Sequence, residues 1–223
     1  MPRRTSDRQL FFREFLRNFH TTGAVLPSGG RLAAALARYV AENGAPKRIL
    51  EVGPGTGAVT RRIIAAMGPD DRADLVELND RFVVYLRECI DNDPGFQSVA
   101  GRIRVHHCAA EELVAEEPYD LVISGLPLNN FTPPAVERIL QALVGLLKPG
   151  GTLSFFQYIA IRRARALLSG RKERERLRGI GLAMDAVLRG NEIRRDWIWP
   201  NVPPAWVHHV RFQQSDRQAL PVE

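Results

Sequence analysis

The stretch from Arg48 to Thr60, R-I-L-E-V-G-P-G-T-G-A-V-T, constrains the fold more than any other part of the chain. A short apolar run around Glu51 is followed by a glycine turn and then by a helix-like segment over residues 58–67. This order predicts a strand, a tight turn and a helix N-terminus, where free backbone N–H groups and the positive end of the helix dipole face outward. A polar, partly anionic ligand is expected here, because glycine has no Cβ to keep it from the backbone. The glycines stand at alternate positions: Gly53, Gly55 and Gly57.

Three glycines alone also fit a strand-to-helix turn that merely needs flexibility. The nicotinamide-binding fingerprint G-x-G-x-x-G is not met, because the third glycine comes one residue early and Glu51 lies two residues before the first. The pattern E-x-G-x-G-x-G resembles the first motif of class I S-adenosylmethionine-dependent methyltransferases. In that family the acid lies close to the methionine end of the cofactor, and the glycines let the chain pass beneath it. The resemblance implies binding of S-adenosylmethionine, with S-adenosylhomocysteine as product, by Glu51, Gly53, Pro54, Gly55, Thr56 and Gly57.

Size and composition favour one soluble α/β domain with a modest extension, since the chain has 223 residues, 45% of them hydrophobic and 25% charged. Its two cysteines, Cys89 and Cys108, are too few for a disulfide framework, so a reducing, cytosolic setting is expected. The basic N-terminus is not followed by the apolar core of a signal peptide. The sequence also contains no run of about 18 apolar residues that would predict a membrane-spanning helix.

Charge is distributed unevenly along the chain. Residues 1–48 and 161–223 each carry a net charge of +6, whereas residues 49–160 carry −6. We therefore expect the basic flanks, and not the acidic cofactor core between them, to meet a polyanion. That polyanion is either nucleic acid or an anionic bilayer.

An amphipathic helix is predicted over Gln9–His20, with aromatic residues on one face and arginines elsewhere. Two roles fit this helix. It can pack its apolar face on the domain, or it can lie on anionic lipid, where arginine beside bulky aromatics suits the headgroup boundary. The apolar face consists of Phe11, Phe12, Phe15, Leu16 and Phe19.

The segment after this helix carries a second resemblance. Gly23 to Ser28, G-A-V-L-P-S, resembles the stretch before the first motif in bacterial phospholipid N-methyltransferases, which carry G-A-V-x-P-S behind a phenylalanine-rich helix. This resemblance implies a cofactor contact by Ser28. Ribosomal RNA adenine dimethyltransferases are a related branch, but their Gln-Asn-Phe-Leu type of segment is not found here. An alanine-rich helix is expected next, over Arg31–Asn43.

The second strand, expected at Ala73–Leu78, ends in a carboxylate suited to a ribose. Glu77 lies twenty residues beyond Gly57, where it can accept hydrogen bonds from two ribose hydroxyls. A surface acid ahead of the next helix, residues 79–92, is the alternative. With the glycine turn at this spacing we assign Glu77 and Leu78 to the cofactor site.

The third strand, expected at residues 102–108, is followed by two alanines. Many methyltransferases carry Asp-Ala at this turn, where the acid reaches the adenine amino group. Ala109 and Ala110 occupy the matching places here, so adenine contact would come from backbone groups or from Glu111.

The fourth strand, Tyr119–Ser124, leads into a loop that should border the transferable methyl, because ligands of open parallel sheets bind outside the carboxyl ends of the strands. The sequence S-G-L-P-L-N-N-F is close to the S-G-L-P-x motif of phospholipid N-methyltransferases. The aromatic that follows the proline in amino methyltransferases of nucleic acids is missing, which argues against a stacked base. The predicted contacts are Ser124 for the cofactor and Gly125, Leu126 and Pro127 for the substrate.

The fifth strand, expected at Thr152–Tyr158, follows a helix at Pro133–Leu147 and a K-P-G-G segment that is common in class I methyltransferases. Tyr158 is the main catalytic candidate, because it could orient the amine and hold methylated ammonium groups by a cation–π contact. Packing at the rim is the alternative for this ring. Asn129 is a further candidate for the same pocket.

The C-terminal third is basic. Residues 162–178 contain eight Lys/Arg, which fit either an ordinary solvated helical face or a surface that binds lipid. The last two strands are expected in residues 191–213, joined by an N-x-P-P-A turn that also resembles the end of the phospholipid methyltransferases. His208 and His209 lack a cysteine or acid at ligand spacing, so no metal site is expected.

These elements predict an α/β fold with a Rossmann-like, mostly parallel seven-stranded sheet and helices on both faces. Residues 1–28 form the N-terminal helix and loop, residues 29–213 the domain with a basic helical insertion at 161–190, and residues 214–223 a tail. The family resemblance implies successive methylation of phosphatidylethanolamine toward phosphatidylcholine by a cytoplasmic protein held peripherally on the inner membrane, without metal or nucleic acid. Two alternatives stay open: an rRNA adenine N-methyltransferase-like enzyme and a non-catalytic, cofactor-binding protein that interacts with membranes.

Overall fold

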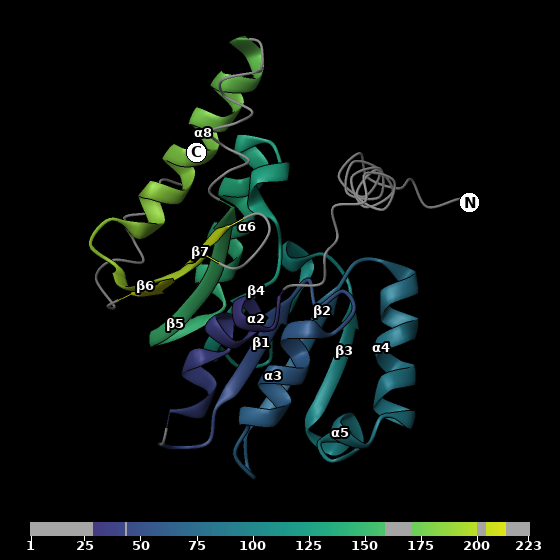
Figure 1. Ribbon diagram of the computed structural model, residues 1–223. Coiled ribbons are helices and arrows are strands. Elements are labelled where there is room, and N and C mark those ends of the chain that lie inside the picture. Colours follow the sequence, from purple (N-terminus) through teal and green to yellow (C-terminus); the bar gives the residue numbers. More distant parts are fainter. Residues whose placement is uncertain (1–28, 43, 159–170, 200–203, 213–223) are drawn as a thin grey trace.

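The fold is built on one seven-stranded sheet whose strand order is β3-β2-β1-β4-β5-β7-β6. In the computed structural model, residues 29–42, 44–158, 171–199 and 204–212 are described (Figure 1). The first five strands in this order are parallel to one another, and β7 runs antiparallel to both of its neighbours. The strands are β1 (Arg48–Val52), β2 (Arg72–Glu77), β3 (Ile103–His107), β4 (Tyr119–Ser124), β5 (Leu147–Tyr158), β6 (Glu192–Ile198) and β7 (Ala205–Arg211).

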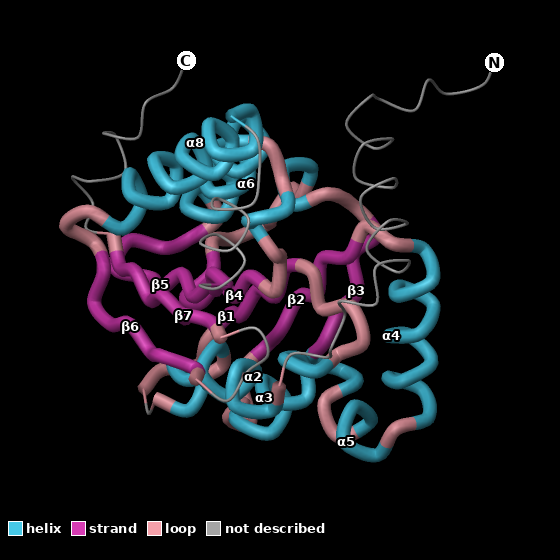
Figure 2. The backbone as a smooth tube through the Cα atoms, turned by 45° about the horizontal axis from the view of Figure 1, so that its top comes forward, coloured by secondary structure: helices cyan, strands magenta, loops and turns pink. Residues whose placement is uncertain are grey.

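Helices cover both faces of this sheet, which gives three layers (Figure 2). The apolar residues of the strands alternate between two buried clusters, since successive side chains of a strand point to opposite faces. One cluster lies under α6 and α8, and the other lies under α2 and α3. The helices are α2 (Gly30–Leu36), α3 (Ala58–Ala66), α4 (Asp80–Asn92), α5 (Pro94–Gln97), α6 (Pro133–Gly145) and α8 (Arg171–Leu188).

The predicted fold class is confirmed, with a mostly parallel sheet and helices on both faces. Because β1 to β5 are parallel, their carboxyl ends meet at one edge of the sheet. This edge carries the glycine turn after β1, Glu77 at the end of β2, the loop after β4 and Tyr158 at the end of β5. Within the described ranges, no helix has the length and apolar character needed to cross a membrane.

Two elements differ from the predicted ones by more than two residues. The helix expected over Arg31–Asn43 is interrupted, because α2 ends at Leu36 and a 3₁₀ turn follows over Arg38–Ala41. The turn lets Arg38 donate from Nε to Asp196 Oδ2 over 2.8 Å.

The fifth strand was also predicted to begin too late. It starts at Leu147, so that the K-P-G-G segment belongs to the strand, and its pairing with β4 shifts between Tyr119 and Leu121. The sequence pattern K-P-G-G predicts a break before the strand. In the structure, the irregular pairing of β5 with β4 accommodates these residues within the strand.

Candidate active site

The glycine turn after β1 adopts backbone angles that suit glycine. Gly53, Gly55 and Gly57 have φ values of 74°, 56° and 76°, a region in which a Cβ is strained. A Cβ on Gly53 would also come within 2.6 Å of Leu126 Cδ2, whereas one on Gly55 would meet no atom within 4 Å. Gly53 thus allows the turn to pack on the loop after β4, and Gly55 leaves the backbone open to a ligand.

Glu51 lies directly beneath this turn and is fully buried, with 0% of its surface exposed. The hydroxyl of Thr60 donates to its Oε2 over 2.7 Å, and its Oε1 has no hydrogen-bond partner among the described residues. Burial raises the pKa of Glu51 to about 8; the nearby carboxylate of Glu77 adds to the rise, and the Thr60 hydrogen bond opposes it. The site therefore holds a buried acid whose ionised form would be stabilised by a cation placed beside it.

Glu77, the last residue of β2, ties the glycine turn to the second strand. Its Oε2 accepts from Gly55 N–H over 3.1 Å, and its Oε1 accepts from Asn79 N–H over 2.8 Å. Burial raises the pKa of Glu77, against these backbone hydrogen bonds. The two acids predicted from the sequence thus converge on one turn from neighbouring strands.

A cleft of about 310 Å³ opens beside this turn, between the ends of β1, β2 and β3 and the first turns of α6. Six of the residues predicted from the sequence line it: Gly53, Glu77, Leu78, Ala109, Ala110 and Leu126. Most of the exposed cleft wall is apolar, which suits an adenine ring, while Glu77 supplies an acceptor for hydroxyl groups.

Part of the lining was not predicted, because it comes from the beginning of α6 and the two residues before it. These residues are Phe131, Thr132, Ala135, Arg138 and Ile139. Ala135, Arg138 and Ile139 have the i, i+3, i+4 spacing of one helical face. That spacing, in a helix that directly follows a loop of the predicted site, is the signal that could have identified them.

The turn after β3 differs in detail from what was expected. The N–H of Ala109 donates to Glu112 Oε2 over 3.1 Å, so this backbone group is already paired. Glu111, the side chain considered for adenine, lines the cleft. Cys108 and Glu112 complete this wall, and neither was predicted.

Several predicted residues lie next to the cleft without lining it. Ser124 accepts at Oγ from Leu126 N–H over 3.3 Å, and a Cβ on Gly125 would come within 2.6 Å of the carbonyl oxygen of Gly53. Both residues thus hold the loop after β4 close to the glycine turn. Pro54, Thr56, Gly57 and Pro127 also lie outside the lining, and Ser28 lies outside the described residues.

The two catalytic candidates contact each other at the ends of β4 and β5. Asn129 is 2% exposed, and its Nδ2 donates to the carbonyl oxygen of Tyr158 over 3.1 Å. This hydrogen bond fixes the orientation of the amide. Its oxygen, Oδ1, has no hydrogen-bond partner within the described part of the chain. The Tyr158 ring packs edge-on against Phe156, with ring centroids 5.0 Å apart, and burial raises the pKa of its hydroxyl.

The histidines of β7 have structural partners. His208 Nδ1 contacts Glu192 Oε1 at 2.7 Å. His209 lies between Ser154 Oγ, at 2.7 Å from Nδ1, and Asp196 Oδ2, at 3.3 Å from Nε2. The Ser154–His209–Asp196 chain has the order of a hydrolase triad, but all three residues are buried and Asp196 is paired with Arg38 and Arg194, so we interpret the chain as a structural network. Among the described residues no group of three His, Cys, Asp or Glu could hold a metal ion.

Similarity to known proteins agrees with this geometry. Residues 49–151, from β1 into β5, match the family model described as a methyltransferase domain. An ornithine lipid N-methyltransferase from Singulisphaera acidiphila is 28% identical over 145 residues, which are 65% of this chain and 74% of that protein.

Two further curated relatives match over shorter stretches. A ubiquinone/menaquinone biosynthesis C-methyltransferase from Ectopseudomonas mendocina is 29% identical over 50% of this chain and 41% of its own length. A ribosomal RNA small subunit methyltransferase A from Parasynechococcus marenigrum is 33% identical over 46% of this chain and 32% of its own length. The chain thus aligns with less than half of each of these two proteins.

Among solved structures, the N-methyltransferase NodS from Bradyrhizobium japonicum has the same fold. It superposes with a TM-score of 0.61 at 16% identity, over 85% of this chain and 99% of NodS. A second structure of NodS contains S-adenosylhomocysteine.

The fold, the site and the match to a methyltransferase domain over residues 49–151 together indicate an S-adenosylmethionine-dependent methyltransferase. The residues present fit this cofactor, because the buried carboxylate of Glu51 can balance a cation, Gly55 leaves the turn accessible and Glu77 faces the cleft. S-adenosylmethionine is therefore the cofactor of this domain. Of the three curated relatives above, the ornithine lipid N-methyltransferase is the one of whose length this chain covers the largest share.

Proposed function

We propose that the chain methylates the amine of the phosphatidylethanolamine headgroup, successively toward phosphatidylcholine, at a membrane surface. The observation that carries this proposal is the pairing of Asn129 with Tyr158 at the carboxyl end of β5, on the edge of the sheet at which the cofactor cleft also opens. The buried, unpaired Oδ1 of Asn129 supplies an acceptor for an N–H group, and the half-buried Tyr158 supplies a ring and a hydroxyl. Similarity to an ornithine lipid N-methyltransferase supports a lipid amine as the substrate class.

The loop after β4 also favours an alkyl amine over a nucleobase. Leu128 follows Pro127 at the place where nucleic-acid amino methyltransferases carry an aromatic, and it is fully buried. Phe131 lines the cofactor cleft but is 1% exposed, so neither side chain offers an exposed stacking platform. A small aliphatic amine does not need such a platform.

S-adenosylmethionine, when bound, supplies a methyl group on a sulfonium, whose leaving group is neutral. The residues of the chain then have to place an unprotonated amine behind that methyl. An alkylammonium has a pKa of about 10, so the amine must lose a proton first. Because burial raises the pKa of Tyr158, its hydroxyl stays protonated at neutral pH and serves as a hydrogen-bonding group. Asn129 Oδ1 can accept the remaining N–H and so direct the nitrogen lone pair.

The ring of Tyr158 gives a reason for repeated transfer. Each added methyl removes an N–H donor, so hydrogen bonding to Asn129 weakens as methylation proceeds. A cation–π contact does not depend on N–H groups and contributes about 1 kcal/mol or more. The pair of residues can therefore hold both the first amine and its methylated products.

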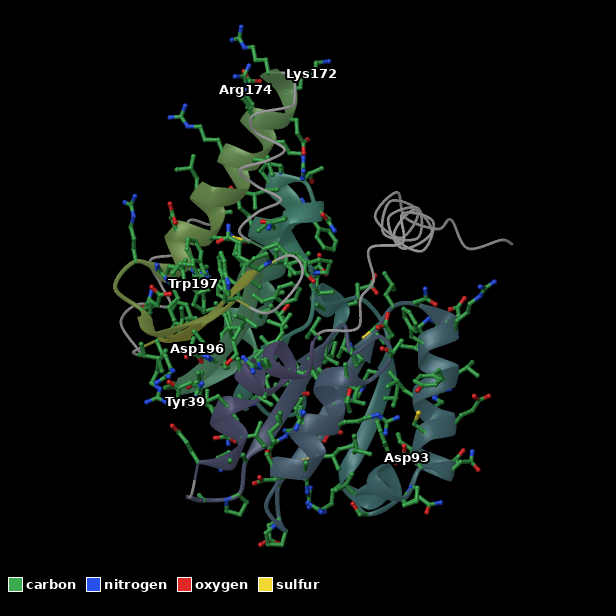
Figure 3. All side chains as sticks on the ribbon, viewed as in Figure 1. Tyr39, Asp93, Lys172, Arg174, Asp196 and Trp197 are labelled. Atoms are coloured by element: carbon green, nitrogen blue, oxygen red, sulfur yellow. The ribbon has the colours of Figure 1, made fainter. Side chains whose placement is uncertain are left out.

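Membrane association and a cytoplasmic location on the inner membrane are part of this proposal. The N-terminal helix with Phe11, Phe12, Phe15 and Phe19 lies outside the described residues, as do positions 159–170. From Arg171 to Arg178 the basic run forms the beginning of α8, where Lys172 and Arg174 are exposed and point outward (Figure 3). Such cations suit an anionic headgroup layer.

The direct test incubates the full chain with methyl-labelled S-adenosylmethionine and phosphatidylethanolamine vesicles, with and without anionic lipid, beside an rRNA sample. We expect label in the lipid, in mono-, di- and trimethylated forms, and none in RNA. Label in RNA and none in lipid would establish a nucleic-acid methyltransferase instead. Cofactor binding by calorimetry with no label in any acceptor would indicate a non-catalytic protein.

A further inference from the structure

All three tryptophans of the chain fall in the last two strands and the turn between them: Trp197, Trp199 and Trp206. Trp197 is 64% exposed and Trp199 is 69% exposed, although tryptophan is a large apolar residue. Their rings contact each other edge-on, with centroids 5.8 Å apart. We refer to these three residues as the tryptophan patch.

The patch lies on the α8 side of the sheet. In β6 the flanking residues Asp196 and Ile198 are buried on the other side, where Asp196 accepts from Arg38 and Ile198 packs under α2 and α3. Because the side chains of a strand alternate, Trp197 projects from the opposite face. Its cross-strand neighbour is Trp206, and Figure 3 shows Trp197 on the side of the molecule that carries α8.

One cationic side chain accompanies these rings. The guanidinium of Arg195 lies over the Trp206 ring, 5.4 Å from its centroid, and is also paired with Glu192. Arg194 is paired with Asp196 and so belongs to the opposite face of β6. The flank to which the patch belongs, residues 161–223, has a net charge of +6.

The position of the patch relates it to the active site. Ile198 pairs with Ala205, which pairs with Tyr158, so the ends of β6 and β5 lie in one row across the sheet. Strands are spaced by about 4.8 Å, which places the Trp197–Trp199 end of β6 about 10 Å from the Tyr158 backbone. The patch therefore lies at the same edge of the sheet as the proposed amine site, although the Tyr158 ring packs in the cluster under α2 and α3, on the opposite face.

The chemistry of the patch fits a bilayer better than a second copy of the chain. Tryptophan with arginine is the combination found at the headgroup level, where an apolar ring with a polar N–H and a long cationic side chain are both satisfied. β6 is the edge strand that a second copy could extend, but it carries Arg194 and Arg195 in its middle. Charged residues on an edge strand oppose strand-to-strand pairing.

We propose that the tryptophan patch is an interfacial anchor that docks the active-site edge of the sheet on an anionic phospholipid surface. The proposal rests on the proposed function only in that both place a lipid at this edge. It adds an attachment point within the catalytic domain, separate from the N-terminal helix and the basic run.

The test uses the intrinsic fluorescence of the full chain, because every tryptophan belongs to the patch and no label is needed. With phosphatidylglycerol vesicles we expect a blue shift of the emission and quenching by brominated acyl chains, with a smaller effect for phosphatidylcholine vesicles. Emission and quenching that do not respond to phosphatidylglycerol vesicles would overturn the proposal.

A double variant, Trp197→Ala with Trp199→Ala, is expected to sediment with these vesicles about tenfold less, since interfacial binding scales with the apolar area that enters the interface. Both side chains are exposed, so circular dichroism should show an unchanged fold. The matched control is Val114→Ser, which removes an apolar side chain that is 92% exposed and lies outside the patch. This control should bind vesicles like the unmodified chain. A pair of Trp→Phe changes should retain most of the binding.

These experiments distinguish a failure of the proposed anchor from a failure of the proposed function. Methyl transfer to phosphatidylethanolamine dispersed in detergent micelles does not require docking, so the double alanine variant should keep its rate there and lose it on vesicles. Absence of lipid methylation with intact vesicle docking would reject the proposed function alone. Vesicle binding by the double variant equal to that of the unmodified chain would reject the anchor. A dimer in solution that the double variant disrupts would reject it as well, in favour of a second copy.

Discussion

Arg176 of α8 donates from Nη1 to the backbone carbonyl of Asn129 over 3.1 Å. The same nitrogen donates to the carbonyl of Phe131 over 2.7 Å, and Glu173 holds the guanidinium from the other side with its Oε1 2.6 Å from Nη2. Arg176 thus connects α8, which carries the surface cations, with the loop after β4, which carries Asn129. The backbone from Asn129 to Phe131 determines where the side-chain amide of Asn129 points.

Replacing Arg176 by Ala should therefore displace this loop. We expect kcat/KM for micellar phosphatidylethanolamine to fall about tenfold or more, because hydrogen bonds to charged groups contribute about 1.5–3 kcal/mol. Arg176→Lys should recover part of the rate, since lysine keeps the charge but lacks the planar fork. Arg171→Ala is the control, because it removes the same charge from the exposed end of α8, where Arg171 pairs with Glu175. Equal losses in Arg171→Ala and Arg176→Ala would attribute the effect to net charge.

The buried acid predicts a pH dependence of cofactor affinity. With a pKa of about 8, Glu51 is largely protonated at pH 7 and ionises toward pH 9. A cationic cofactor favours the ionised form, so affinity measured by calorimetry should rise between pH 7 and pH 9, whereas Glu51→Gln should bind weakly and without this rise. Each unit of pKa change on binding corresponds to a tenfold change in affinity. Glu88→Gln, on the exposed side of α4, serves as the control.

The same residue affects stability with the opposite sign. Because the folded state raises the pKa of Glu51 from 4.5 to about 8, it binds more protons than the unfolded state between these values. The free energy of unfolding should therefore decrease as pH rises through this window, by at most about 1.4 kcal/mol per pH unit. Glu51→Gln should flatten this slope in denaturant titrations. An unchanged slope would show that Glu51 does not titrate there.

Tyr158→Phe separates the roles of the hydroxyl and of the ring. We expect the first methyl transfer to slow about tenfold, while cofactor affinity stays unchanged, because Tyr158 does not line the cofactor cleft. Tyr158→Ala should in addition reduce the later transfers, since it removes the cation–π contact of about 1 kcal/mol. Product ratios of mono-, di- and trimethylated lipid measure the difference. Full rate in Tyr158→Phe with bound cofactor would exclude a role for the hydroxyl.

Gly53→Ala tests the close approach of the glycine turn to the loop after β4. The added Cβ meets Leu126 Cδ2 at 2.6 Å and the backbone has positive φ, so we expect a loss of about 1–3 kcal/mol in unfolding free energy and weaker cofactor binding. Gly145→Ala is the matched control, because a Cβ there meets no atom within 4 Å at the end of α6. That change should leave stability equal or increase it slightly. Equal behaviour of the two variants would contradict the steric argument.

The parts of the site that could be predicted depend on short, continuous stretches of the sequence. Glu51, the glycines and Glu77 follow from a strand, a turn and the end of the next strand, and each is where parallel pairing brings it. Leu126 could be placed because its loop follows a buried strand of the same sheet.

The parts that could not be predicted depend on contacts between distant segments. After the interruption of α2, Arg38 pairs with Asp196, which lies 158 positions away in the sequence. Arg176 reaches Asn129 across 47 positions, and periodicity in α8 shows it only as one more surface cation. From the sequence the tryptophans resemble ordinary strand residues, and only the register shows that Trp197 is paired with Trp206 on the edge strand of the sheet.

The carboxylate of Glu77 has a consequence for the kinetics of cofactor capture. Since it accepts hydrogen bonds from the N–H groups of Gly55 and Asn79, it holds the turn in place, and we expect little chain entropy to be lost on association. Association should accordingly be rapid and should follow a single exponential in stopped-flow mixing, with the difference between good and poor ligands residing in the dissociation rate.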